Sequence, residues 1–196
     1  ILLLTFLSHM VSQYPEVHVK IARGSVELLT QSLRNESVDI IAIDRRALIA
    51  AEDLTVEDLP PLRGGFLCRS GHPLAKEASI RLEDLRKFPI SSTPLSDEIA
   101  RILVEDFGPK AHPAHLVTLN SEDINSLLDL VETTDTIFFG IYACARARIL
   151  AGKFQEIQLE QQVELFGHYA LVTQARRSEP PSVKLFRDFV RTKFGE

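Results

Sequence analysis

Residues 14–43 read YPEVHVKIARGSVELLTQSLRNESVDIIAI, and this stretch decides the fold class. Between residues 17 and 23, apolar residues alternate with polar ones, which predicts a half-buried strand. Ser25 is suited to cap a helix over residues 26–35, whose apolar residues form one face. The nearly continuous apolar run over residues 38–44 is typical of a parallel strand buried on both faces. Strand, helix and strand in this order predict an α/β fold with right-handed crossovers.

The alternation of helices and strands continues along the rest of the chain. Residues 1–13 have helical spacing and end before Pro15, and a polar loop leads to Pro60-Pro61. Further strands are predicted at residues 64–70, 88–92, 115–119, 136–142, 154–159 and 166–174. Further helices are predicted at residues 82–87, 93–109, 120–131, 143–152 and 180–196.

A second α/β set occupies the middle of the chain, so we expect two lobes. The first lobe takes residues 1–90 and 168–196, and the second takes residues 91–167. Two segments, near residues 90 and 168, then cross between the lobes. Each lobe is expected to be a mostly parallel sheet flanked by helices. No Gly- or Ser-rich linker marks the crossings.

The composition is that of an ordinary folded domain. Of the 196 residues, 45% are hydrophobic and 25% are charged, and the net charge is −5. An acidic chain is not expected to bind nucleic acid by itself, because phosphate contacts need clustered Lys and Arg. The opening residues lack the features of a signal peptide, and the apolar run 137–145 is too short to span a membrane. Because the chain starts at Ile1 within a helical pattern, we expect it to be a fragment.

The sequence contains no recognisable catalytic motif. A nucleophile elbow, a phosphate loop, a dinucleotide fingerprint and a zinc-protease pair are all absent. His112 and His115 fit a polar loop better than a metal site, and no cofactor or metal is expected. Cys68 and Cys144 are expected to be free thiols in a reducing compartment, the cytoplasm. Asp39 and Asp44 flank a buried strand, and a catalytic carboxylate pair there stays open beside the simpler interpretation of strand-end carboxylates.

Small hydroxyl residues recur where helices are expected to begin. They are Ser25, the run Ser91-Ser92-Thr93 before Pro94, and Ser121. Helix capping alone explains all of them, with Thr93 and Ser121 as caps of the next two helices. In a two-lobed α/β protein, however, ligands bind outside the carboxyl ends of strands, where helix N-termini favour anions. Capping and ligand binding therefore both remain open for these residues.

Several segments together resemble the effector-binding domain of LysR-type transcriptional regulators. One is the opening stretch, with its tyrosine-proline, Gly-Ser and aspartate-containing apolar strand. Others are GHPLAKEASIRLEDLRKFPIS (71–91), TDTIFFGIYACARARILAGKFQEIQL (134–159) and the closing PPSVKLFRDFVR (180–191). Each motif alone is weak, but their order and spacing over nearly the whole chain are fairly specific.

The resemblance implies a periplasmic-binding-protein-like fold of type 2 and no enzymatic activity. A small-molecule effector, often an organic anion or aromatic acid, is implied to bind between the lobes. DNA would be bound only by a winged helix-turn-helix domain that precedes this region and is absent here. The resemblance further implies a homodimer of this domain and a tetramer of the full-length protein, with no membrane partner.

Matching positions imply a ligand-binding set. It comprises Ser25, Ser91, Ser92, Thr93, Asn120, Ser121, Thr136, Phe138 and Phe139. The chain departs from the family at two places. The first strand, expected before Ile1, is missing. The segment 134–141 lacks the glycines that open it and the proline that closes it in many members, and it carries the charged Asp135 and the bulky Phe138-Phe139 instead. From the residues alone, Phe138 and Phe139 fit a core better than a ligand stack. An aromatic or amphipathic effector is therefore as reasonable as a small carboxylate, and a periplasmic solute-binding protein of a transporter remains the alternative function.

Overall fold

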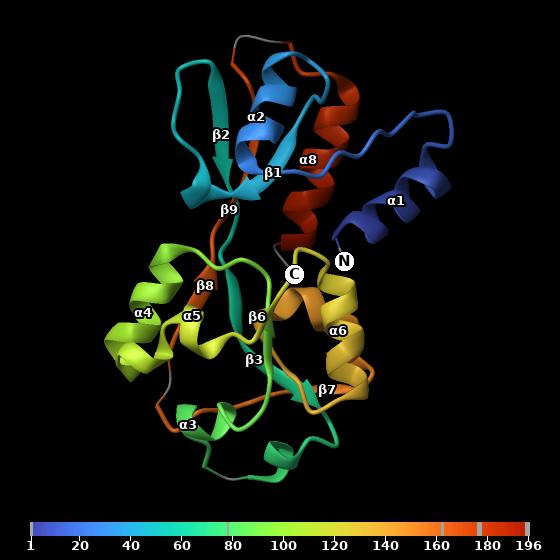
Figure 1. The fold of residues 1–196 in the computed structure, drawn as a ribbon. Helices are drawn as coiled ribbons and strands as arrows, with labels where there is room; N and C mark the ends of the chain where they lie inside the picture. Colours follow the sequence, from blue (N-terminus) through green and yellow to red (C-terminus); the bar gives the residue numbers. More distant parts are fainter. Residues whose placement is uncertain (1, 78, 162, 176–177, 195–196) are drawn as a thin grey trace. The chain divides into compact units, whose positions relative to one another are not determined.

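A computed structural model describes every residue except 1, 78, 162, 176–177 and 195–196 (Figure 1). The chain forms two compact units. Unit 1 comprises Ile1–Pro61 and His168–Glu196, and unit 2 comprises Leu62–Gly167. We expected the first passage between lobes near residue 90. In the structure residues 62–90 belong to unit 2, because strand β3 (Leu62–Arg69) pairs with three later strands of that unit, β6 (Ile137–Ile141), β7 (Phe154–Glu156) and β8 (Leu165–Gly167).

Unit 1 contains a sheet in which the last strand of the chain lies in the middle. Its order is β1-β9-β2, with β1 at Ile41–Asp44, β9 at Tyr169–Gln174 and β2 at Leu54–Asp58. β9 runs antiparallel to both neighbours, and Val172 is in register with Ile41 on one side and Val56 on the other. The expected mostly parallel sheet is wrong for this unit, because β9 returns from the far end of the chain between β1 and β2. β2 lies in the part of the chain that we expected to be a polar loop leading to Pro60-Pro61.

Helix α2 (Val26–Arg34) forms where the sequence predicted it. The Ser25 hydroxyl accepts a hydrogen bond from the Leu28 amide at 3.3 Å, which caps the helix. Leu33 is fully buried and packs in a cluster with Ile41, Ile43 and other residues of the sheet. The amphipathic face read from the sequence is thus the face that covers β1 and β9.

Helices α1 (Leu2–Gln13) and α8 (Pro181–Phe194) pack on each other in unit 1 (Figure 1). Phe6 is buried with its ring edge-on to Phe186 at 4.8 Å and to Phe189 at 5.3 Å between centroids. Such edge-to-face pairs add about 0.5–1.5 kcal/mol to the burial of the rings. This aromatic contact joins the first and last helices of the chain.

The strand predicted at residues 17–23 is wrong. These residues are extended, but within the part of the chain that the structure describes they pair with no strand. Val17, Val19 and Ile21 are 36%, 39% and 44% exposed. Alternation of side chains predicts two faces of an extended segment, but a strand also needs a hydrogen-bonding neighbour, which the pattern cannot supply.

Unit 2 is built on a larger mixed sheet. Its order is β5-β4-β6-β3-β7, and β8 also pairs with β3. The strands other than β3 are β4 (Ile90–Ser92), β5 (Leu119–Asn120), β6 (Ile137–Ile141), β7 (Phe154–Glu156) and β8 (Leu165–Gly167). The helices are α3 (Leu82–Leu85), α4 (Asp97–Phe107), α5 (Pro113–Leu116), α6 (Ile124–Thr133) and α7 (Arg146–Leu150). Single 3₁₀ turns occur at Arg45–Ala47 in unit 1 and at Pro73–Lys76, Pro109–Ala111 and Tyr142–Ala145 in unit 2.

Only part of this sheet is parallel. β4 runs parallel to β5 and β6, whereas β3 runs antiparallel to β6, β7 and β8. The α/β class and the two-sheet design are confirmed, but the expected dominance of parallel pairs is wrong. In the parallel part, strands of one direction end together at one edge of the sheet, which is the type of place where α/β proteins bind ligands.

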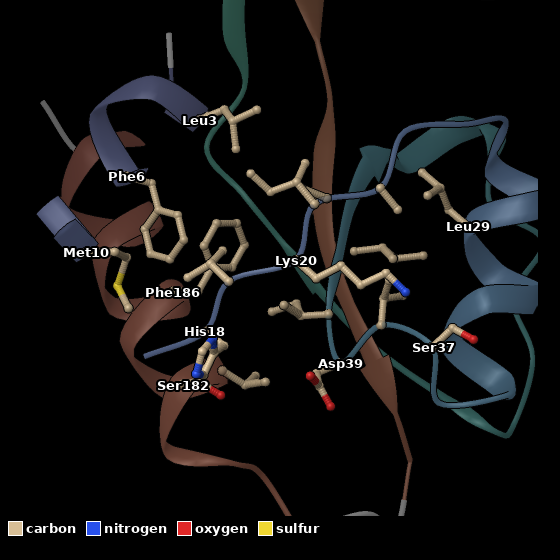
Figure 2. Close-up of a pocket in the computed structure, with 18 of the residues that line it drawn as sticks. Leu3, Phe6, Met10, His18, Lys20, Leu29, Ser37, Asp39, Ser182 and Phe186 are labelled. Atoms are coloured by element: carbon tan, nitrogen blue, oxygen red, sulfur yellow. The ribbon is translucent and has the colours of Figure 1, made fainter. Parts of the chain in front are cut away.

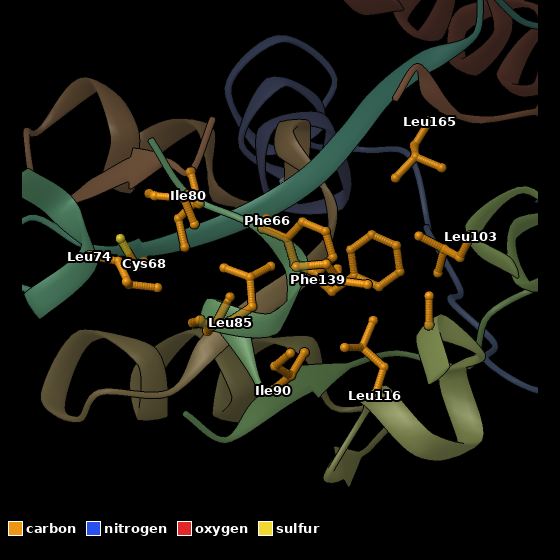
Figure 3. Close-up of a cluster of buried hydrophobic side chains, with 14 of the residues drawn as sticks. Phe66, Cys68, Leu74, Ile80, Leu85, Ile90, Leu103, Leu116, Phe139 and Leu165 are labelled. Carbon is orange, nitrogen blue, oxygen red and sulfur yellow. The ribbon is translucent and has the colours of Figure 1, made fainter. Parts of the chain in front are cut away.

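The sheet of unit 2 separates two hydrophobic clusters. The larger one contains Phe66 and Phe139, whose rings stack at 4.5 Å between centroids (Figure 3). Figure 3 also shows Leu103 and Leu116 of the α4–α5 region directed into the same cluster. Leu67 and Phe138, the residues adjacent to Phe66 and Phe139 in β3 and β6, belong to the second cluster with residues of α6. Successive strand residues therefore supply two cores.

Several helices and strands of unit 2 begin at other residues than the sequence predicted. Ser96, not Thr93, caps α4, with its hydroxyl accepting from the Ile99 amide. Thr93 precedes Pro94, which disfavours helical backbone at Thr93. Asp123, not Ser121, caps α6 by accepting from the Ser126 amide. The strand predicted at 115–119 is instead the short helix α5 followed by β5, because proline favours the first turn of a helix.

Candidate functional site

Two parallel strands of unit 2 end side by side. Ser92, the last residue of β4, is in register with Asn120, the last residue of β5. The Ser121 amide donates to the Ser92 carbonyl at 3.2 Å, which holds the two following loops together. We call Ser92, Thr93, Asn120 and Ser121 the β4–β5 edge. It is the type of place, outside the carboxyl ends of parallel strands, where α/β proteins bind ligands.

The hydroxyl groups of the two serines of β4 form hydrogen bonds with backbone carbonyls. Ser91 and Ser92 are fully buried. The Ser91 hydroxyl donates to the Ile137 carbonyl at 3.2 Å, and the Ser92 hydroxyl lies 2.8 Å from the carbonyls of Phe139 and Thr93. These bonds satisfy buried hydroxyls that would otherwise cost about 1–3 kcal/mol each. Their direct role is to fix the end of β4 against β6.

Thr93 and Asn120 are the free polar side chains of the β4–β5 edge. Thr93 is half-buried and Asn120 is exposed. Within the described part of the chain, neither side chain forms a hydrogen bond. Their hydroxyl and amide can therefore both donate and accept without breaking an existing bond. Ser121 is less available, since its hydroxyl accepts from the Asp123 amide at 3.1 Å.

Acidic residues lie on the segments that follow β4 and β5. Asp97 and Glu98 occupy the first turn of α4, and Asp123 caps α6 after Glu122. Carboxylates at a helix N-terminus compensate its partial positive charge. The N-termini of α4 and α6 therefore offer less attraction to an anion than the sequence-based hypothesis assumed.

Thr136, Phe138 and Phe139 do not join the β4–β5 edge as ligand contacts. Thr136 precedes β6 at the amino end of that strand, and its hydroxyl accepts from the Thr134 hydroxyl at 2.8 Å. Phe138 is fully buried and Phe139 is 2% exposed, each in one of the two hydrophobic clusters of unit 2. Both rings belong to the core, as the residues alone indicated.

Ser25 lies in unit 1, exposed at the N-terminus of α2. Its hydroxyl is used as the helix cap, and Glu27 occupies the first turn. A hydrogen bond from the backbone amide of Glu27 to its own carboxylate is the main cause that lowers the pKa of Glu27. A hydrogen bond with the Ser25 hydroxyl lowers this pKa further. The capping role predicted for Ser25 is confirmed by this geometry.

The remaining sequence candidates have structural roles. Asp44 pairs with Arg46 at 3.3 Å, and the His112 ring accepts from the Ala114 amide at 3.2 Å. Cys68 and Cys144 are free thiols. Burial raises the pKa of Cys68 to about 11 and also raises the pKa of Cys144, so both stay protonated at neutral pH.

An apolar groove in unit 1 was not predicted from the sequence. It has a volume of about 410 Å³ and lies between the extended segment 17–23 and residues 37–42. Figure 2 shows Phe6, Met10 and Phe186 together at one side of it, away from Lys20 of the segment 17–23. The alternation of apolar and polar residues over 17–23 was the signal in the sequence that could have pointed to this groove.

The sequence matches the LysR substrate binding domain family over residues 1–195. The chain belongs to this family. LysR regulatory domains bind small-molecule effectors and are not enzymes, so the enzyme hypothesis is excluded and the family match favours a regulator over a transporter protein. No helix within the described residues has the length and apolar character needed to cross a membrane.

Solved structures share the fold at low identity. A putative transcriptional regulator from Vibrio parahaemolyticus has 20% identity and a TM-score of 0.75, with 99% of this chain and 87% of that chain covered. HinK, a LysR family regulator from Pseudomonas aeruginosa, has 21% identity and a TM-score of 0.70, covering 99% and 65%. The PA01 protein from the same organism, a putative LysR family transcriptional regulator, has 20% identity and a TM-score of 0.69, with 99% of this chain and 66% of that chain covered. The LysR domain described here thus spans about two thirds of these two regulators. No curated protein sequence matches it.

Proposed function

We propose that this LysR domain senses a small organic molecule through the β4–β5 edge and controls transcription through a DNA-binding domain elsewhere in the protein. The observation that carries the proposal is the pair of unbonded polar side chains, Thr93 and Asn120, at the adjoining ends of two parallel strands. The buried Ser91 and Ser92 support it by holding β4 rigidly against β6. A rigid frame with free donors and acceptors lowers the cost of ordering the site when a ligand binds.

The chemistry of the β4–β5 edge restricts which functional group of the effector can bind there. A hydroxyl and an amide pair well with an alcohol, an amide or a carbonyl. Four carboxylates on the flanking segments, those of Asp97, Glu98, Glu122 and Asp123, oppose a carboxylate at this point. We propose that the effector, an organic or aromatic acid by family resemblance, meets the β4–β5 edge with an uncharged polar group. Its acid group then lies on another part of the molecule.

Effector binding would act by shifting populations. A ligand changes a conformational equilibrium only by its difference in affinity for the two states. We propose that the state preferred by the effector changes the geometry of a homodimer, and of a tetramer in the longer protein. That change would alter the spacing of the DNA-binding domains.

A thermal-shift screen tests the proposal. The panel contains aliphatic and aromatic acids that carry a hydroxyl or amide, beside the same acids without that group. Ligands that bind the native state raise Tm by mass action. The expected hits stabilise the unaltered domain and the control Thr55→Val, which changes an exposed threonine of β2, but stabilise Thr93→Val and Asn120→Ala less. Hits that stabilise all four proteins equally would remove the β4–β5 edge as the site.

A further inference from the structure

The border strand of unit 2, β5, has little backbone pairing to hold it in place. It consists of Leu119 and Asn120, and among the strands of the described residues it pairs with β4 alone. The short helix α5 comes directly before it, so the strand pairing on this side stops short of Ile90, the first residue of β4. Because neither residue of β5 is buried, no hydrophobic face fixes its register against β4.

Thr118, the residue ahead of β5, supplies the contacts that the short strand lacks. Its hydroxyl accepts a hydrogen bond from the Ile90 amide at 2.9 Å and donates to the Ile90 carbonyl at 3.1 Å. The Thr118 amide donates to the same carbonyl at 2.8 Å. A hydroxyl can serve both backbone groups because it is a donor and an acceptor at once. One threonine thus satisfies the amide and the carbonyl of a fully buried residue.

Thr118 fixes one end of the pairing between β4 and β5, and Ser121 fixes the other. At the carboxyl end the Ser121 amide donates to the Ser92 carbonyl at 3.2 Å. Asn120 lies between these two fixed points and is in register with Ser92. A slip of one residue would turn the Asn120 side chain to the opposite face of the sheet. The contact between Thr118 and Ile90 therefore decides where the Asn120 amide is presented.

We propose that Thr118 is the positioning residue of the β4–β5 edge: its hydroxyl, bonded to Ile90, sets the register of β5 and so holds the Asn120 side chain in place for the effector. Thr118 acts through Asn120 and is not itself a ligand contact. The inference rests on the function proposed above for the edge being the effector site, whereas the placement of Asn120 by Thr118 stands without it.

Another threonine of unit 2 provides a matched control. The Thr134 hydroxyl lies 2.7 Å from the Leu130 carbonyl and accepts from the Thr136 amide at 3.1 Å. Thr134 precedes β6 at the amino end of that strand, whereas the β4–β5 edge lies at carboxyl ends of strands. Loss of the Thr134 hydroxyl therefore removes comparable bonds to the backbone without altering the register of β5.

NMR spectra of the unliganded protein test the placement of Asn120. Thr118→Val keeps the shape of threonine but has no hydroxyl. It is expected to shift the side-chain amide signals of Asn120 and to speed hydrogen exchange of the Ser121 amide at least about tenfold. Thr118→Ser retains the hydroxyl and is expected to restore both readouts. Thr134→Val is expected to leave both unchanged, although it lowers Tm.

Two results would overturn the inference. One is a Thr118→Val protein with the Asn120 signals and Ser121 exchange of the unaltered protein. The other is an equal change in Thr134→Val, which would make the effect one of general stability. If Thr118→Val does not fold, the unaltered protein decides, since an Ile90 amide that exchanges as fast as an exposed loop amide would contradict the bond to Thr118.

Binding separates this inference from the proposed function. The ligand is the hydroxy or amide acid of the thermal-shift panel that raises Tm most, and titration calorimetry measures its affinity. Thr118→Val is expected to weaken binding at least about fivefold, as loss of one hydrogen bond does, whereas Thr118→Ser and Thr134→Val bind like the unaltered domain. Displacement of Asn120 with unchanged affinity, in Thr118→Val and Asn120→Ala alike, would overturn the proposed function and leave the positioning by Thr118 intact.

Discussion

Phe138 and Phe139 are neighbours in β6, yet their side chains are buried in different hydrophobic clusters of unit 2. Phe139 stacks on Phe66, at 4.5 Å between ring centroids, while Phe138 lies among Leu127, Leu128 and Val131. Since residues of a strand alternate between the faces of a sheet, this pair joins the two cores across one peptide bond. The position is therefore structural, although the family resemblance placed it among ligand contacts.

Replacing either phenylalanine by alanine is expected to cost about 3–5 kcal/mol of unfolding free energy, because each change leaves a cavity in a closely packed core. Urea denaturation followed by circular dichroism measures this. Phe138→Leu and Phe139→Leu are the matched controls and should cost clearly less. A folded, fully stable alanine variant that has lost effector binding would instead assign the ring to the ligand site.

The ring of Phe138 leaves no space for a side chain at Gly140. A Cβ atom at Gly140 would lie 2.6 Å from Cζ of that ring, closer than real atoms approach. Because Phe138 is fully buried, its ring has little room to move, and Gly140→Ala is expected to destabilise unit 2 by about 1–3 kcal/mol. Thermal unfolding measures the loss. The double variant Gly140→Ala, Phe138→Leu should recover part of it, and failure to recover would locate the strain elsewhere.

The sequence predicted those features that depend on local chemistry. The cap at Ser25 and the buried faces of α2 and of β6 follow from residue type and spacing, and all were found. The caps of α4 and α6 were misplaced by two or three residues, because several residues before each helix are able to cap it. Ser96 and Asp123 were chosen over Thr93 and Ser121 by loop geometry that the sequence does not show.

Pairing between distant segments could not be predicted in the same way. β9 lies between β1 and β2 although more than a hundred residues separate it from them, and no local pattern signals that arrangement. For the same reason the alternation at 17–23 was interpreted as a strand with no knowledge of its partner. At the candidate site, the prediction included Thr93 and Asn120 among the ligand contacts together with Ser91 and Ser92. Only the structure shows that the hydroxyls of Ser91 and Ser92 are already hydrogen-bonded within the protein, whereas the side chains of Thr93 and Asn120 are not.

His72 is expected to make the stability of unit 2 depend on pH. The ring is 2% exposed; Nδ1 accepts from the Leu74 amide at 3.0 Å, and Nε2 donates to the Asp135 carbonyl at 3.1 Å. Burial is the main cause that lowers the pKa of His72, and the nearby Arg69 adds to it, while Asp135 opposes it. Below pH 6.5 the unfolded chain then binds a proton more readily than the folded one, so stability falls as pH decreases from that value.

Thermal unfolding between pH 7.5 and 5 checks this (values chosen to bracket the ordinary histidine pKa of about 6.5). His72→Asn is the matched variant, because its side-chain oxygen can still accept from the Leu74 amide but does not titrate. The Tm of the variant is expected to fall less than that of the unaltered protein over this range. Parallel curves would show that other groups carry the pH dependence.

Ser25→Ala tests whether the hydroxyl that caps α2 has a second role. Loss of the bond to the Leu28 amide is expected to lower the unfolding free energy by about 0.5–1 kcal/mol, since the cap is exposed. Ser25→Asp retains an acceptor and should keep most of the stability. Effector affinity is then measured by titration calorimetry, with a hit from the thermal-shift screen as ligand. If the serine only caps the helix, affinity follows stability, so both variants bind nearly as well as the unaltered domain. We predict that Ser25→Ala weakens binding by more than it lowers stability and that Ser25→Asp, despite its intact cap, does not restore it; unchanged affinity in both variants would remove Ser25 from the ligand-binding set.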